Sequence, residues 1–100
     1  MPADTPVDRF GTVTAVQTKP GFVGVEAITE TQIVELYPPL ARSVLDAGYD
    51  ILSGDNEGFE AEIFFARGKG VTGTYLLREG PCEGQVTIKL LYTHERAGKA

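Results

Sequence analysis

The chain has 100 residues, of which 42% are hydrophobic and 23% charged, and its net charge is −5. This size and composition suit one globular domain with a single core. Nucleic acid is not expected as a ligand, because its binding depends on a cationic surface that displaces counterions. No apolar run approaches the ~18 residues of a membrane span, and no charged-then-apolar leader begins at Met1. We therefore expect a cytoplasmic protein, or a soluble domain excised from an exported one.

The single cysteine and the single histidine restrict the chemistry that the chain can support. Cys82 and His94 are too few for a disulfide within the chain, a zinc finger or a two-histidine metal site. Cys82 is followed by Glu83, whose carboxylate opposes formation of the thiolate that a nucleophile needs. His94 is expected at the far end of a strand from Cys82. The sequence therefore favours a protein without catalytic residues, metal or cofactor.

The first part of the chain predicts a flexible arm followed by a hairpin. Residues 1–9 contain little that can be buried, so we place the folded domain at 10–94 and a flexible tail at 95–100. Between Thr12 and Thr29, valines and an isoleucine stand among threonines, which favours strands. Pro20 and Gly21 occupy the positions that a type II turn prefers, so two short strands are expected to form a hairpin.

Periodic apolar residues next predict one helical segment between Glu30 and Ala47. They recur at spacings of three and four, which is typical of the buried stripe of a helix, and are Ile33, Leu36, Tyr37, Leu40, Val44 and Ala47. Pro38 and Pro39 lack backbone donors, which favours a kink or two shorter helices. Gly48 is expected to end the segment in a left-handed conformation.

After the helix the period changes to two, which predicts four strands at 49–53, 59–66, 71–77 and 85–93. Glycine-rich turns separate them, so an antiparallel meander is the simplest connection. The expected fold class is therefore α+β, with a kinked helical segment packed on an antiparallel sheet in two layers and the order β-β-α-β-β-β-β. This order resembles the general layout of cystatin-like domains. None of that family's inhibitor motifs is present, so the resemblance implies no function.

Alternation along these strands predicts which side chains face the helix. The inward set is Phe59, Ala61, Ile63, Phe65, Val71, Gly73, Tyr75, Leu77, Val86, Ile88, Leu90 and Tyr92. Bringing these residues together requires an odd number of loop residues around Gly68, such as three. On the opposite face, the expected register aligns Glu62, Thr74 and Lys89 in one row.

The opposite face also carries apolar residues where a two-layer fold should be solvated. Phe64, Leu76 and Leu91 lie there, and with Glu62 and Lys89 they form a candidate contact surface. The alternatives are that the first hairpin folds over this face and buries the three residues, or that they are exposed without a role.

Two further motifs have ordinary structural explanations. The acidic stretch of Asp55, Glu57, Glu60 and Glu62 lacks the ligand pattern of an EF-hand loop, so a polar turn and a solvated strand face are expected. The basic, glycine-rich stretch 67–70 lies between predicted strands rather than before a helix, so it suits a hairpin tip better than a phosphate site.

Two hypotheses for function remain. The first is a non-catalytic interaction module that binds a partner protein or itself through a sheet face, a sheet edge or the turn at 54–58. The alternative is a small-ligand-binding protein or minor enzyme with a pocket between helix and sheet. Hydroxyl groups for such a pocket would come from Tyr37, Tyr49, Tyr75 and Tyr92.

Overall fold

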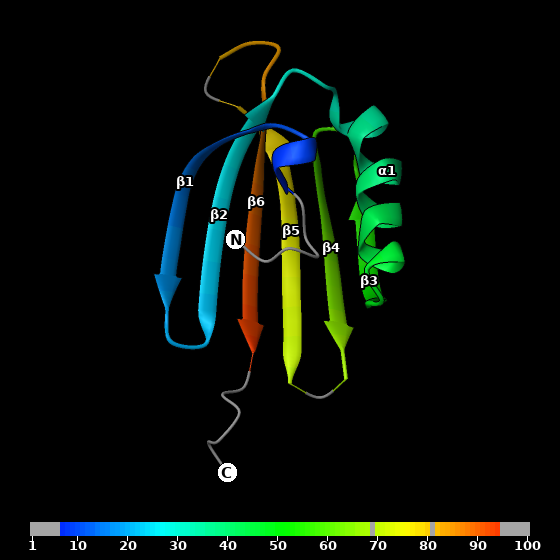
Figure 1. The fold of residues 1–100 in the computed structure, drawn as a ribbon. Helices are drawn as coiled ribbons and strands as arrows, with labels where there is room; N and C mark the ends of the chain where they lie inside the picture. Colours follow the sequence, from blue (N-terminus) through cyan, green and yellow to red (C-terminus); the bar gives the residue numbers. More distant parts are fainter. Residues whose placement is uncertain (1–6, 69, 81, 95–100) are drawn as a thin grey trace.

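The computed structural model describes residues 7–68, 70–80 and 82–94, and it has one α-helix packed on a six-stranded antiparallel sheet (Figure 1). This is the α+β fold that the sequence predicts. The elements in chain order are η1 (Val7–Arg9), β1 (Thr12–Lys19), β2 (Phe22–Thr29), α1 (Ile33–Asp46), β3 (Asp50–Asn56), β4 (Glu60–Arg67), β5 (Val71–Glu79) and β6 (Val86–His94). Their order in the sheet is β1-β2-β6-β5-β4-β3.

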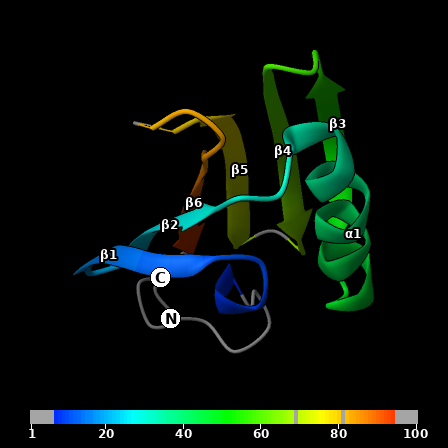
Figure 2. The same ribbon diagram turned by 90° about the horizontal axis from the view of Figure 1, so that it is seen from above.

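The helices lie on one side of the sheet. Helix α1 packs against β3, β4 and β5, and the short 3-10 helix η1 packs against β1 and β2 on the same side (Figures 1 and 2). The hairpin β1–β2 does not fold over the opposite face, because β2 pairs with β6 and extends the sheet sideways. None of the helices described here is long and apolar enough to cross a membrane.

The core forms where the inward set of strand residues meets the helix. Strand alternation places these side chains as predicted, and the completely buried ones include Ile63, Phe65, Tyr75, Leu77, Ile88 and Leu90. Arg67 pairs with Val71, so the loop between β4 and β5 has the three residues expected around Gly68. Phe59 is an exception, since it precedes β4 and is 59% exposed.

The rows across the opposite face differ from the prediction by two residues along β5. Leu76, not Thr74, lies between Glu62 and Lys89. Thr74 lies in the next row, between Phe64 and Leu91. A shift by two keeps each side chain on its face, which is why the faces were predicted correctly although the rows were not.

Helix α1 is continuous through both of its prolines, so the interpretation of two shorter helices is wrong. Its buried stripe consists of Ile33, Leu36, Leu40 and Val44. Pro38 and Pro39 leave the carbonyls of Val34 and Glu35 without their helical donors. All four residues are exposed, so water can hydrogen-bond these carbonyls. Gly48, at φ 93°, follows the helix as predicted.

The packed part of the chain begins earlier than predicted. Val7 in η1 is completely buried in the core, although residues 1–9 were expected to be an arm and the domain to begin at Phe10. A single valine among prolines and aspartates has no periodic partner in the sequence, so the pattern did not distinguish it. Residues 1–6 of the predicted arm and the predicted tail 95–100 lie outside the described residues.

Candidate functional site

The five residues of the predicted contact surface all lie on the sheet face opposite α1, which we call the outer face. The register brings Glu62, Leu76 and Lys89 into one row and Phe64 and Leu91 into the next. Phe64 is 42% exposed, Lys89 is exposed, and the other three are half-buried. None of the described elements covers them, so the hypothesis of burial under the first hairpin is wrong.

One row of the outer face carries no charge. It crosses all six strands and consists of Gln17, Gly24, Leu91, Thr74, Phe64 and Ser53, which we call the uncharged row. Phe64 is its most prominent apolar side chain, and Leu91 is half-buried beside Thr74. Exposed apolar side chains on a sheet face are typical of a surface that excludes water against a partner.

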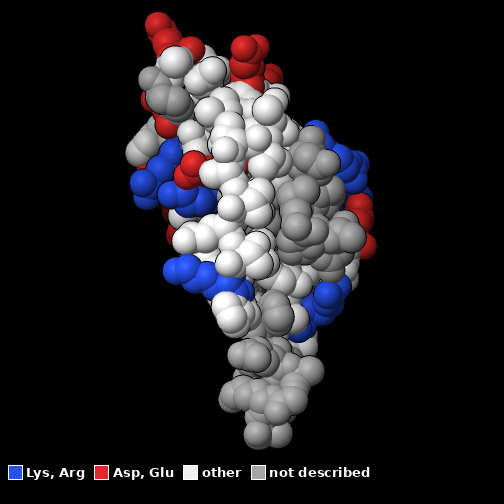
Figure 3. Space-filling model, turned by 60° about the vertical axis from the view of Figure 1, so that its left-hand side comes forward, with Lys and Arg blue, Asp and Glu red and all other residues white. Residues whose placement is uncertain are grey.

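One ion pair borders this row, and a second lies one row further along the strands. The Lys89 ammonium lies 3.5 Å from the Glu26 carboxylate across β2 and β6, and the Arg78 guanidinium lies 3.5 Å from Glu60 across β4 and β5. All four side chains are between 41% and 66% exposed, so each pair contributes only about 0–1 kcal/mol. Figure 3 shows both basic and acidic groups at the margins of an uncharged band that runs along the β1 side of the molecule.

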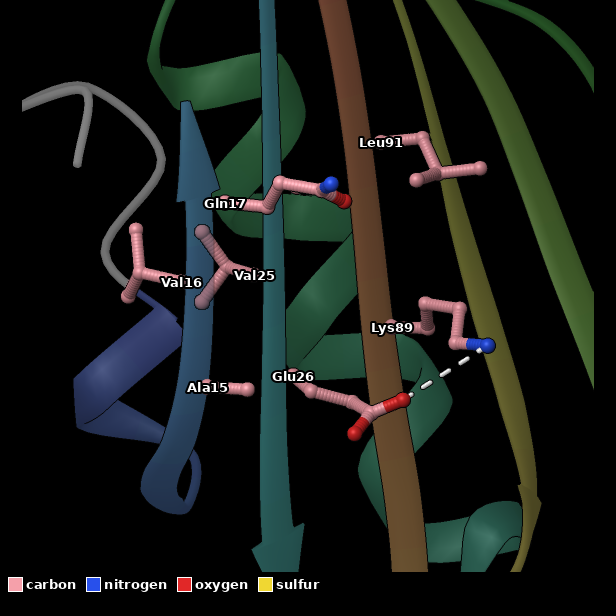
Figure 4. Close-up of a pocket in the computed structure, with 8 residues that line it drawn as sticks. Ala15, Val16, Gln17, Val25, Glu26, Lys89 and Leu91 are labelled. Atoms are coloured by element: carbon pink, nitrogen blue, oxygen red, sulfur yellow. Dashed lines mark ion pairs between the residues drawn. The ribbon is translucent and has the colours of Figure 1, made fainter. Parts of the chain in front are cut away.

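A hollow of about 240 Å³ interrupts the outer face where β1, β2 and β6 meet (Figure 4). The surface is hollowed here because Gly24 on β2 has no side chain and Ala15 on the neighbouring β1 has a short one. A Cβ at Gly24 would lie 3.5 Å from the Phe22 ring and 3.7 Å from Leu91, so these two side chains stand around the glycine. A second hollow of about 390 Å³ shares Glu26, Lys89 and Leu91 with the first and continues toward β5.

Both edges of the sheet are interrupted by irregular pairing. The register of β1 shifts between Val13 and Ala15, and that of β3 shifts between Ile51 and Ser53. Such bulges twist an edge strand and hinder pairing with another chain. The outer face therefore offers a more regular surface for contact than either edge.

The residues considered for chemistry are not assembled into a site. Cys82 is exposed in the loop before β6, whereas His94 pairs with Val71 at the other end of that strand. Within the described ranges, no three histidine, cysteine, aspartate or glutamate residues are grouped as metal ligands. In the acidic turn, the protonated Glu57 carboxyl donates a hydrogen bond to Asp55, and this bond together with the Asp55 charge raises the pKa of Glu57. The turn is therefore a repulsive cluster of carboxyl groups.

Three of the four tyrosines belong to the core rather than to a pocket. Tyr49 meets the Phe65 ring edge to face, with 4.9 Å between centroids, and its hydroxyl lies 3.3 Å from that of Tyr92. Tyr75 is completely buried beside Phe65. The fourth, Tyr37, places its hydroxyl against Gly54 of β3. These contacts favour tyrosines that fill the space between helix and sheet.

Sequence analysis missed the part of the surface that β1 and β2 contribute. Glu26, Gly24 and Phe22 alternate with the buried Val25 and Ala27, so their shared face could be recognised from the sequence. Their place beside β6 could not, because nothing local specifies which strand the hairpin joins. No model of a known protein family matches the chain, and no curated protein matches it.

Proposed function

We propose that this protein is a non-catalytic protein-binding or interaction module that acts through its outer sheet face. The observation that carries the proposal is the 42% exposed Phe64 in an uncharged row of an uncovered face. Removing apolar surface from water stabilises a complex by about 25 cal/mol per Å². Aromatic side chains near the centre of a contact surface commonly contribute most to binding.

The other two surfaces considered from the sequence are less favourable. The bulges oppose addition of a strand at β1 or β3. The turn at 54–58 carries Asp55 and Glu57, whose carboxyl groups already repel one another, as the raised pKa of Glu57 indicates. A partner at that turn would need a strongly basic surface, whereas the outer face combines apolar groups with charges of both signs.

Capture from a lysate of the source cell with three immobilised proteins tests the proposal. These are the wild type, Phe64→Asp, and the matched control Val34→Asp, which places the same charge at a 61% exposed apolar position on the helix. We expect the wild type and Val34→Asp to retain the same protein, identified by mass spectrometry, and Phe64→Asp to lose it. Retention of the captured protein by all three proteins, or its loss by both variants, would contradict the proposal.

A further inference from the structure

We propose that the outer face binds a second copy of this chain face to face, with Phe64 of each copy seated in the hollow at Gly24 of the other. This inference rests on the proposed interaction function and names the partner. It follows from the arrangement of one projecting ring and one hollow on the same face, since a two-fold interface brings the same surface of both copies together.

The projection and the hollow lie in the same row. The order across the sheet is Gly24 on β2, Leu91 on β6, Thr74 on β5 and Phe64 on β4. With strands about 4.8 Å apart, Gly24 and Phe64 are separated by about 14 Å. A two-fold axis along the strands between β6 and β5 therefore passes about 7 Å from each. Rotation about this axis places each Phe64 ring over the opposite Gly24, and Leu91 over Thr74.

The neighbouring row is complementary under the same rotation. It consists of Lys19, Phe22, Thr93, Thr72, Ala66 and Asp50 from β1 to β3. The rotation places the large Phe22 opposite the small Ala66, and the Lys19 ammonium opposite the Asp50 carboxylate. Thr93 meets Thr72. In this row, size and charge are thus matched between the two copies without any change in the fold.

The row on the other side, which consists of Glu26, Lys89, Leu76 and Glu62 from β2 to β4, gives Lys89 a specific place in the dimer. Rotation brings Glu62 of one copy over Glu26 of the other, which alone would be unfavourable. Lys89 lies 3.5 Å from Glu26 on the adjacent strand, so its ammonium is placed between the two carboxylates. Without this cation the two partly dehydrated carboxylates would repel each other uncompensated, so the contact depends on Lys89.

The area of the outer face determines how tightly the two copies are expected to bind. Six strands span about 24 Å and eight residues of a strand about 26 Å, so each copy contributes on the order of 600 Å². The total of about 1,200 Å² is at the lower end for specific protein interfaces. We therefore expect a dimer that dissociates in the micromolar range, rather than a permanent one.

Sedimentation velocity on the full chain between about 5 µM and 1 mM tests the inference. The wild type should change from monomer to dimer over this range. Phe64→Asp removes the projection and Gly24→Leu fills the hollow, and each should weaken dimerisation by at least about 30-fold. Lys89→Gln should weaken it as well, whereas Val34→Asp on the helix should not. Circular dichroism confirms that each variant is folded.

An isotope-filtered NMR measurement on the wild type does not depend on any substitution. In a mixture of labelled and unlabelled chains, nuclear Overhauser contacts between the Gly24 Hα atoms and the Phe64 ring should appear. At about 14 Å within one chain, these groups are too far apart to give them. A wild type that stays monomeric at 1 mM, or a dimer without these contacts, overturns the inference. If Phe64→Asp still loses a captured protein of another sequence, the proposed function stands with that partner instead.

Discussion

At the scale of single residues, Gly73 determines how the aromatic core is built. It lies on β5 directly opposite Phe65 of β4, and the Phe65 ring occupies the space where a side chain at position 73 would begin. The ring can then reach Tyr49 and Tyr75, at 4.9 and 5.8 Å between centroids. An aromatic ring that covers a strand glycine compensates for the missing side chain.

Replacement of Gly73 by alanine is expected to destabilise the protein by about 1–3 kcal/mol, because the added methyl group overlaps the Phe65 ring in a closely packed core. Urea denaturation followed by circular dichroism measures the change. Gly24→Ala is the matched control, since its Cβ would have ordinary contacts of 3.5 Å or more. Its free energy of unfolding should stay unchanged or rise by up to about 1 kcal/mol. Equal losses in both variants would contradict the steric explanation.

The turn between β3 and β4 predicts a measurable titration. The Asp55 hydrogen bond and charge raise the pKa of Glu57 above its ordinary value of 4.5. The folded state therefore binds this proton more tightly than the unfolded state does. The associated stability is present below pH 4.5 and is lost as the pH rises through the folded-state pKa. Asp55→Asn should lower the pKa of Glu57 toward 4.5, as followed by NMR of its carboxyl carbon. An unchanged titration would show that Asp55 is not the cause.

At the scale of elements, one arginine links the end of helix α1 to the sheet. The last turn of α1 has no basic residue of its own. Arg67 at the end of β4 supplies one, because its Nη1 donates a hydrogen bond of 3.2 Å to the Ala47 carbonyl. Its guanidinium also lies 4.5 Å from the centre of the Tyr49 ring. A cation at this position compensates the negative end of the helix dipole.

Arg67→Ala is expected to lower the free energy of unfolding by about 1–2 kcal/mol. The helix end loses its hydrogen-bond donor, and the Tyr49 ring loses the guanidinium that lies over it. Arg78→Ala is the matched control, since it removes the same side chain from an exposed ion pair 3.5 Å long. That variant should lose no more than about 1 kcal/mol. Chemical denaturation of both variants gives the comparison, and a larger loss for Arg78→Ala would refute it.

The elements that the sequence predicted are those specified by neighbouring residues. The alternation of inward and outward side chains in β4, β5 and β6 is set by residues two positions apart. The three-residue loop at Gly68 follows from it, because the inward side chains of β4 and β5 must lie on the same face. Of the two alternatives predicted for Pro38 and Pro39, only that of two shorter helices failed, because exposed carbonyls make the lost hydrogen bonds tolerable within one helix. Pairing of β2 with β6 and burial of Val7 depend on residues distant in the chain, so no local pattern contains them.

At the scale of the whole molecule, the described helices cover one face of the sheet and leave the other open, and two adjacent residues test this. Ile63 is completely buried, whereas Phe64 is 42% exposed on the outer face. Ile63→Asp should lose more than about 4 kcal/mol, since it leaves a cavity and buries a charge. Phe64→Asp should change stability by about 1 kcal/mol at most. Thermal unfolding of the two variants is compared at a protein concentration too low for the chain to dimerise. An equally large loss of stability in both variants would show that the outer face is covered.

The position of β6 has a consequence for how the chain folds. The last of the described strands lies in the middle of the sheet, joining the hairpin β1–β2 to the meander β3–β4–β5. During synthesis, the hairpin and the meander can each form from local contacts, but each keeps an open inner edge until residues up to His94 have left the ribosome. Completion of the sheet is therefore a late event that depends on long-range contacts. A chain released before β6 is made would leave the edges of β2 and β5 without their partner strand and open to pairing with other chains.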